Sequence, residues 1–100
     1  MKYLSTRDDS LSRSFNDILY QGLSRDGGLY LPQSWPRIDL LSLKNKSYEE
    51  VACEIIFPYV NENIEKLDLQ KILNETYSNF NHKKIAPLVE LENNKFLLEL

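Results

Sequence analysis

The sequence predicts an α+β protein in which three main helices pack on a small, mostly antiparallel sheet. Apolar residues recur at helical spacing in three segments, residues 14–23, 47–59 and 68–80. Shorter apolar runs lie beside turn-forming residues near both ends of the chain. The chain has 100 residues, 42% of them hydrophobic, and a chain of this length buries roughly 65% of its unfolded surface. We therefore expect a single domain over residues 1–100.

The first helix is expected to begin after Ser12 or Ser14. Ser14 and Asp17 have the three-residue spacing of a capping box, although Glu or Gln is the more usual partner. From Phe15 onward, four apolar residues at i, i+3, i+4 and i+8 share one face. The helix ends before residues 26–28 (DGG), where the chain turns because glycine adopts positive φ without a Cβ clash.

The second and third helices have the clearest patterns. Ser47 and Glu50 form a capping box, and the apolar period runs from Tyr48 to Tyr59. Pro58 lacks an amide hydrogen, so this helix is expected to kink there or to end near Phe57. Asp68 is the expected N-cap of the third helix. The residues that this helix is expected to bury are Leu69, Ile72, Leu73, Thr76, Tyr77 and Phe80.

Three strands are expected, at residues 2–6, 88–91 and 95–100, and residues 92–94 (ENN) form the turn of a hairpin. The last strand carries apolar residues on both faces. A strand of this kind is covered on both sides. We therefore expect the natural polypeptide to continue beyond Leu100, while a strand that closes a small sheet is the alternative.

No group of residues has the pattern of a catalytic, cofactor-binding or metal site. His82 has no Cys or His nearby and is expected in a surface loop. Cys53 lies beside the apolar stripe of its helix and is expected to be an inert, partly buried thiol. The acidic pairs 8–9 and 49–50 point apart on a helix and do not form acid/base dyads. Arg7 is expected in a surface salt bridge, with an anion site as the alternative.

Composition excludes several functional classes. The net charge is −3, and no basic stripe suggests a nucleic-acid partner. No apolar run reaches the ~20 residues that cross a bilayer. A single cysteine and an N-terminus without an apolar leader predict a cytoplasmic protein without an internal disulfide.

Several segments, taken in order, resemble the N-terminal domain of the threonine synthase family. They are residues 2–7 (KYLSTR), 14–15 (SF), 21–23 (QGL), 26–32 (DGGLYLP), 47–59, 86–89 (APLV) and 96–100 (FLLEL). The similarity covers essentially the whole chain. The positions that match the family motif, with no role assigned, are Arg7, Gln21, Gly22, Asp26, Gly27, Gly28, Tyr30 and Pro32.

The resemblance implies an enzyme that uses pyridoxal 5′-phosphate (PLP) to convert O-phospho-L-homoserine and water to L-threonine and phosphate. The lysine that binds PLP is expected beyond Leu100, so this segment carries no PLP and no catalytic domain. It is expected to be an accessory domain that packs against the catalytic domains of the same polypeptide and is inactive alone. The alternative is a small stand-alone interaction module whose apolar C-terminal strand pairs with a partner's sheet edge.

Overall fold

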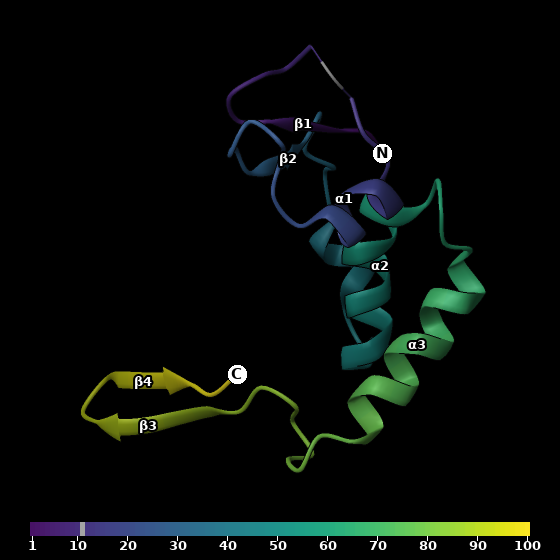
Figure 1. The fold of residues 1–100 in the computed structure, drawn as a ribbon. Helices are drawn as coiled ribbons and strands as arrows, with labels where there is room; N and C mark the ends of the chain where they lie inside the picture. The colour runs from purple at the N-terminus through teal and green to yellow at the C-terminus, as the bar shows by residue number, and fades with distance from the viewer. Residues whose placement is uncertain (11) are drawn as a thin grey trace.

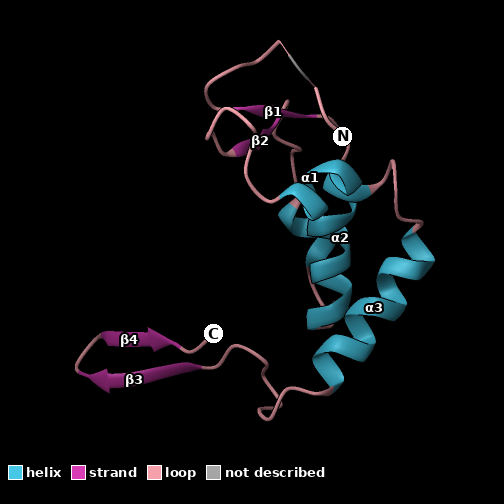
Figure 2. Ribbon diagram, viewed as in Figure 1, coloured by secondary structure: helices cyan, strands magenta, loops and turns pink. Residues whose placement is uncertain are grey.

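The computed structural model describes residues 1–10 and 12–100 and has the predicted α+β class. Its helices and strands are shown in Figure 1 and Figure 2. They follow in the order β1 (Tyr3–Ser5), α1 (Phe15–Gln21), β2 (Tyr30–Pro32), the 3₁₀-helix η1 (Leu40–Leu43), α2 (Tyr48–Val60), α3 (Lys66–Ser78), β3 (Leu88–Glu92) and β4 (Lys95–Leu98).

The strands form two separate antiparallel pairs, where the sequence pattern suggested one small sheet. β1 pairs with β2, with Tyr3 opposite Pro32, and β3 pairs with β4. β2 is not predicted by the sequence pattern, because it has three residues and ends in a proline, which cannot donate to a ladder hydrogen bond. β4 ends at Leu98, two residues earlier than expected.

Both predicted capping boxes are present. In α1, the Ser14 amide donates to the Asp17 carboxylate over 3.0 Å, and the Asp17 amide donates to the Ser14 hydroxyl over 3.3 Å. In α2, the corresponding distances between Ser47 and Glu50 are 2.7 and 3.2 Å. These bonds satisfy backbone amides that have no partner within the helix, so both helix starts follow from local sequence.

The end of α2 excludes one of its two predicted alternatives, an end near Phe57, and the start of α3 differs from the prediction. α2 continues through Pro58 to Val60, because a proline in the last turn removes one hydrogen bond without ending the packing on either side. α3 begins at Lys66, so Asp68 lies inside the first turn and is not the N-cap. The Asp68 carboxylate instead pairs with the Lys71 ammonium at 3.1 Å.

The core lies between α2 and α3. Cys53 and Val60 of α2 pack with Leu69 and Leu73 of α3, and all four are buried. Cys53 is 1% exposed, so the prediction of a partly buried thiol beside the apolar stripe was wrong. The cysteine lies where the two helices meet, and its burial raises the pKa of the thiol.

Several residues expected to be buried are exposed. In α3, Ile72 is 50% exposed and Phe80, just beyond the helix, is 46% exposed. In and after α1, Leu19 and Leu23 are 61% and 59% exposed. Thr76 is also exposed. These side chains stay partly open to solvent, although the Phe80 ring lies 5.3 Å from the Tyr77 ring, centroid to centroid.

Polar contacts attach the N-terminal strand to the end of α2. The Tyr3 hydroxyl donates to the Tyr59 carbonyl over 2.7 Å, and the N-terminal ammonium pairs with Glu62 at 2.8 Å. The Tyr3 ring also lies 6.4 Å from the Phe15 ring, centroid to centroid. These contacts place the β1–β2 sheet beside the helix pair.

Glu54 joins the start of α2 to the start of α3. Its carboxylate lies 2.9 Å from the Lys46 ammonium and 3.1 Å from the Lys66 ammonium. Hydrogen bonds from Lys46 and Lys66 lower the pKa of Glu54. The three side chains therefore form an ion-pair network across the helix pair.

The chain is more open than a compact protein of its size. Its radius of gyration is 16.7 Å, whereas a compact domain of 100 residues has about 13 Å. Its accessible surface is 7974 Å², whereas a compact monomer of this mass exposes about 5,900 Å². The β3–β4 hairpin extends away from the helices, as Figure 2 shows, and every residue of both strands is exposed. No helix in the described part of the chain is long and apolar enough to cross a membrane.

Burial predicts how the Cys53 thiol reacts. A thiol-specific disulfide reagent is expected to leave Cys53 unmodified in the folded chain and to modify it fully in guanidinium, because the reactive thiolate is both inaccessible and disfavoured by its raised pKa. Release of the coloured thiol product measures this reaction. Rapid modification under native conditions would contradict the packing of α2 on α3.

The Glu54 network predicts a dependence of stability on pH. The pKa of Glu54 is lower in the folded chain than in the unfolded chain. The ionised carboxylate therefore stabilises the fold at pH values above its unfolded pKa, and this stabilisation is lost as the pH falls through its folded pKa. The substitution Glu54→Gln should reduce the free energy of unfolding at neutral pH by about 0.5–1 kcal/mol. It should have a smaller effect in acid, as measured by urea unfolding at both pH values.

Glu75→Gln on α3 is the matched control, because the carboxylate of Glu75 takes part in no ion pair among the described residues. If the two substitutions changed the free energy of unfolding equally, the Glu54 ion pairs would contribute nothing to stability.

Candidate functional site

The residues singled out in the sequence gather around the β1–β2 sheet and the turn before β2. Gly22 ends α1 with φ of 73°. Gln21, the last residue of α1, accepts a hydrogen bond from the Tyr30 hydroxyl at 2.9 Å, and Pro32 lies opposite Tyr3 in the sheet. Residues far apart in the sequence motif thus form one cluster.

The Asp26 carboxylate is the centre of this cluster. The Ser5 hydroxyl lies 2.9 and 2.8 Å from its two oxygens, and the Gly28 amide donates to it over 2.8 Å. The Gly28 and Ser5 hydrogen bonds lower the pKa of Asp26. Hydrogen bonds to the charged form of a carboxylate stabilise that form, so the bonds from Ser5 and Gly28 hold the turn against β1.

Gly28 allows the turn to approach β1 this closely. A Cβ at this position would overlap the Ser5 hydroxyl, would lie 2.9 Å from the Asp26 carboxylate, and would lie 3.0 Å from the Thr6 hydroxyl. The chain then continues with the Leu29 amide donating to that Thr6 hydroxyl over 3.0 Å. A side chain at residue 28 would therefore separate the turn from the strand.

Arg7 binds a carbonyl and not a carboxylate. Its Nη1 donates to the backbone oxygen of Asp26 over 3.0 Å, and a Cβ on Gly27 would lie 3.0 Å from the same nitrogen. Gly27 has φ of 76°, so its lack of a side chain both permits the turn and leaves room for the guanidinium. The described residues place no ion-pair partner beside Arg7, so the expected surface salt bridge is absent from this part of the chain.

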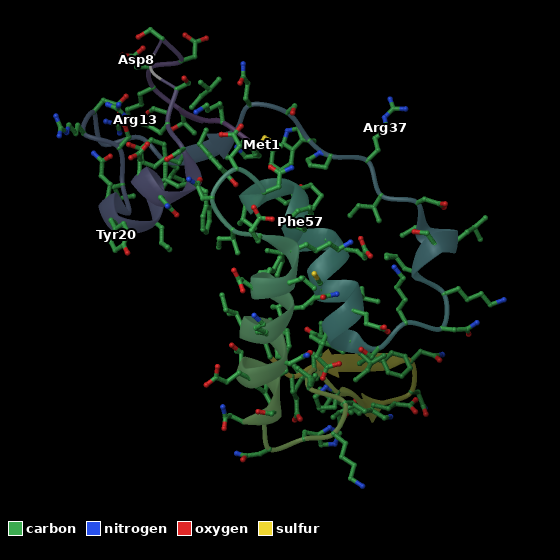
Figure 3. The ribbon with its side chains drawn as sticks, turned by 90° about the vertical axis from the view of Figure 1, so that its right-hand side faces the viewer. Met1, Asp8, Arg13, Tyr20, Arg37 and Phe57 are labelled. Carbon is green, nitrogen blue, oxygen red and sulfur yellow. The ribbon has the colours of Figure 1, made fainter. Side chains whose placement is uncertain are left out.

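A hollow of about 160 Å³ lies next to the cluster. Its walls are Ser5, Asp8, Arg13, Ser24, Arg25, Asp26 and Tyr30. Arg13 and Arg25 also border an adjoining hollow with Tyr20, and Figure 3 shows Asp8, Arg13 and Tyr20 on one side of the molecule. Two arginines and two aspartates balance the charge of the first hollow, which makes it suited to polar contacts.

Sequence reasoning missed both arginines, because no local pattern marks them. Arg13 is held by paired backbone hydrogen bonds of 2.9 Å with Tyr3, and Arg25 lies in the turn closed by the bond from the Ser24 amide to the Gly28 carbonyl. Only the fold brings these two segments together.

The other candidate residues lie outside this cluster or form local hydrogen bonds that stabilise turns and helix ends. His82 is exposed, as predicted, and its Nδ1 accepts a hydrogen bond from the Lys84 amide. Asp8 accepts a hydrogen bond from the Ser10 amide over 2.9 Å, and the bonds from Ser10 lower the pKa of Asp8. Glu50 belongs to the α2 cap. Within residues 1–10 and 12–100, no group of three His, Cys, Asp or Glu side chains is arranged to hold a metal ion.

The contact at Gly28 predicts non-additive substitutions. Gly28→Ala should reduce the free energy of unfolding by about 1–3 kcal/mol, because its methyl group overlaps Ser5. Ser5→Ala removes the hydroxyl that it meets, so the double variant should be destabilised by less than the sum of the two single variants. Urea unfolding of the four proteins measures this, and strict additivity would contradict the contact.

The comparison with known proteins identifies the family. A model of the family described as "Threonine synthase N terminus" matches residues 2–77. Threonine synthase from Pseudomonas aeruginosa is 41% identical over 103 residues, which cover 100% of this chain and 22% of that protein. Threonine synthase from Schizosaccharomyces pombe is 36% identical over 104 residues and is covered over 20% of its length. The chain therefore spans about a fifth of the length of these relatives.

Solved structures support the same relationship. The crystal structure of PLP-bound threonine synthase from Brucella melitensis matches with a TM-score of 0.89 and 41% identity, over 99% of this chain and 22% of that one. The predicted resemblance to the N-terminal domain of threonine synthase is thus confirmed. Because the family model matches more than half of the sequence, the chain belongs to the family of threonine synthase N-terminal regions.

Proposed function

We propose that this chain is the N-terminal accessory domain of a threonine synthase. The complete enzyme would convert O-phospho-L-homoserine and water to L-threonine and phosphate with PLP as its cofactor. One observation carries the proposal: relatives named threonine synthase align with the whole chain, yet the chain covers only 22% of the Pseudomonas protein. The remainder of such a polypeptide would supply the catalytic domains, and residues 1–100 would supply none.

The residues present do not fit PLP. Lys46 and Lys66 pair with Glu54, and Lys2 pairs with Glu62. The remaining five lysines are exposed, and no lysine borders the three described hollows. We therefore assign no chemical step to these residues and infer that the lysine that binds PLP lies in the remainder of the enzyme.

The surface supports an accessory role. The chain exposes roughly 2,000 Å² more than a compact monomer of its mass. An excess of this size is comparable to the surface that permanent interfaces bury. We propose that the catalytic domains of the same polypeptide cover part of it, in the cytoplasm and without a nucleic-acid partner. No observation favours the alternative of a stand-alone interaction module.

The test compares the intact natural gene product with residues 1–100 alone. With O-phospho-L-homoserine and added PLP, the intact protein should release phosphate and form an equal amount of threonine. Residues 1–100 should release no phosphate above the buffer control. Phosphate assays and amino-acid analysis measure the two products.

Each outcome has a separate meaning. Turnover by residues 1–100 alone would contradict the accessory role. An intact, PLP-loaded protein that forms no threonine would contradict the proposed activity.

A further inference from the structure

We propose that the hollow of about 160 Å³ beside the Asp26 turn binds a small α-amino acid in its zwitterionic form. The carboxylate of the ligand would bind Arg13 and Arg25, and its ammonium group would bind Asp8 and Asp26. These four side chains line the hollow, and neutral side chains complete its wall. All four groups belong to this chain, so such binding would not depend on the proposed catalytic activity.

Two separate segments each bring one cation and one anion to this hollow. Asp8 and Arg13 lie between β1 and α1, and Arg25 and Asp26 lie in the turn before β2. The pairing of β1 with β2 brings the segments together. Backbone hydrogen bonds of 2.9 Å in both directions fix Arg13 to Tyr3 of β1. The charges around the hollow sum to zero, which matches a ligand with one positive and one negative charge.

The charged groups of the hollow do not neutralise one another directly. Within residues 1–10 and 12–100, neither of its arginines takes part in an ion pair. Its carboxylates are held instead by neutral donors. Hydrogen bonds from Ser10 lower the pKa of Asp8, and bonds from Gly28 and Ser5 lower the pKa of Asp26. Both carboxylates are therefore ionised at neutral pH, and they border the same hollow as two cations without pairing with them.

An α-amino acid supplies the opposite charge on both sides. A carboxylate accepts paired N–H bonds from guanidinium groups, and an ammonium group has three donors for carboxylate oxygens. The Ser10 bonds lower the pKa of Asp8, but the nearby charge of Asp26 acts in the opposite direction. A bound cation would remove this repulsion between the two carboxylates. A ligand with only one charge would leave one side of the hollow without a partner.

The size of the hollow restricts the ligand to a small amino acid. Cavities of about 150 Å³ hold a molecule as large as benzene, and this hollow has nearly the same volume. The adjoining hollow shares Arg13 and Arg25, but Asp17 is its one acid and is engaged in the α1 cap through Ser14. The first hollow therefore fits a zwitterion better than its neighbour does.

The first test uses the intact natural gene product and L-threonine as the probe. At a concentration of about ten times its Kd, L-threonine should slow amide hydrogen exchange in residues 24–28 by about 10-fold, because the ligand would hold this turn to the segment that carries Asp8 and Arg13. The concentration dependence of the protection gives the Kd. The readout is local to the hollow, so amino-acid binding elsewhere in the enzyme does not produce it. Unchanged exchange up to the solubility limit of L-threonine would overturn the proposal.

Two analogues of the probe each lack one charge. L-threoninamide has no carboxylate, and N-acetyl-L-threonine has no ammonium group. Each should need at least about 10-fold higher concentration for the same protection, because hydrogen bonds to a charged group are lost. Protection by either analogue at the same concentration as L-threonine would contradict recognition of both charges.

Substitutions in the intact protein assign the binding to this hollow. Arg13→Gln and Asp8→Asn should each raise the Kd by about 10-fold, whereas Arg37→Gln and Asp9→Asn should leave it unchanged. Arg37 is exposed and lies apart from Arg13 in Figure 3, and Asp9 is not among the described residues that border the hollow. An unchanged Kd in either hollow variant would overturn the assignment. If a variant fails to fold, the analogues still decide with the unsubstituted protein.

Discussion

The packing of α2 against α3 supports the rest of this structure. Cys53 and Val60 on one helix and Leu69 and Leu73 on the other form its buried core. The N-terminal segment reaches this core through the Tyr3 hydroxyl, which donates to the carbonyl of Tyr59 in α2. The buried apolar core is therefore small for a chain of 100 residues. Most contacts outside it are polar or join residues close in the sequence.

The turn at residues 26–28 shows that polar contacts hold the part of the chain outside the helical core. The Asp26 carboxylate takes hydrogen bonds from Ser5 and Gly28, and the Arg7 guanidinium bonds the backbone of the same turn. None of these groups is deeply buried except Ser5 and Gly28. Hydrogen bonds to a charged group contribute more than those between neutral groups, which suits a sheet of two short strands with little apolar support.

Local signals in the sequence were sufficient for the starts of α1 and α2 and for the turns. Ser14 and Ser47 cap their helices through bonds that span three residues, and such bonds do not depend on the rest of the fold. β2 could not be predicted, because three residues ending in proline become a strand only when β1 lies beside them. The burial of Cys53 could not be predicted either, because it depends on how α3 packs against α2. At the candidate site, the motif positions were identified but their contacts were not, and Arg13 and Arg25 meet only through the fold.

The exposed hairpin has a consequence for biosynthesis. Translation proceeds from the N-terminus, so β3 and β4 would leave the ribosome while the proposed catalytic domains were still unsynthesised. For that interval, Leu88, Phe96, Leu97 and Leu98 would face the solvent as they do in this structure. Exposed apolar strands of this kind bind chaperones and drive aggregation. In the proposed full-length protein, the yield would then depend on protecting eleven residues, 88–98, until the proposed covering domains are synthesised.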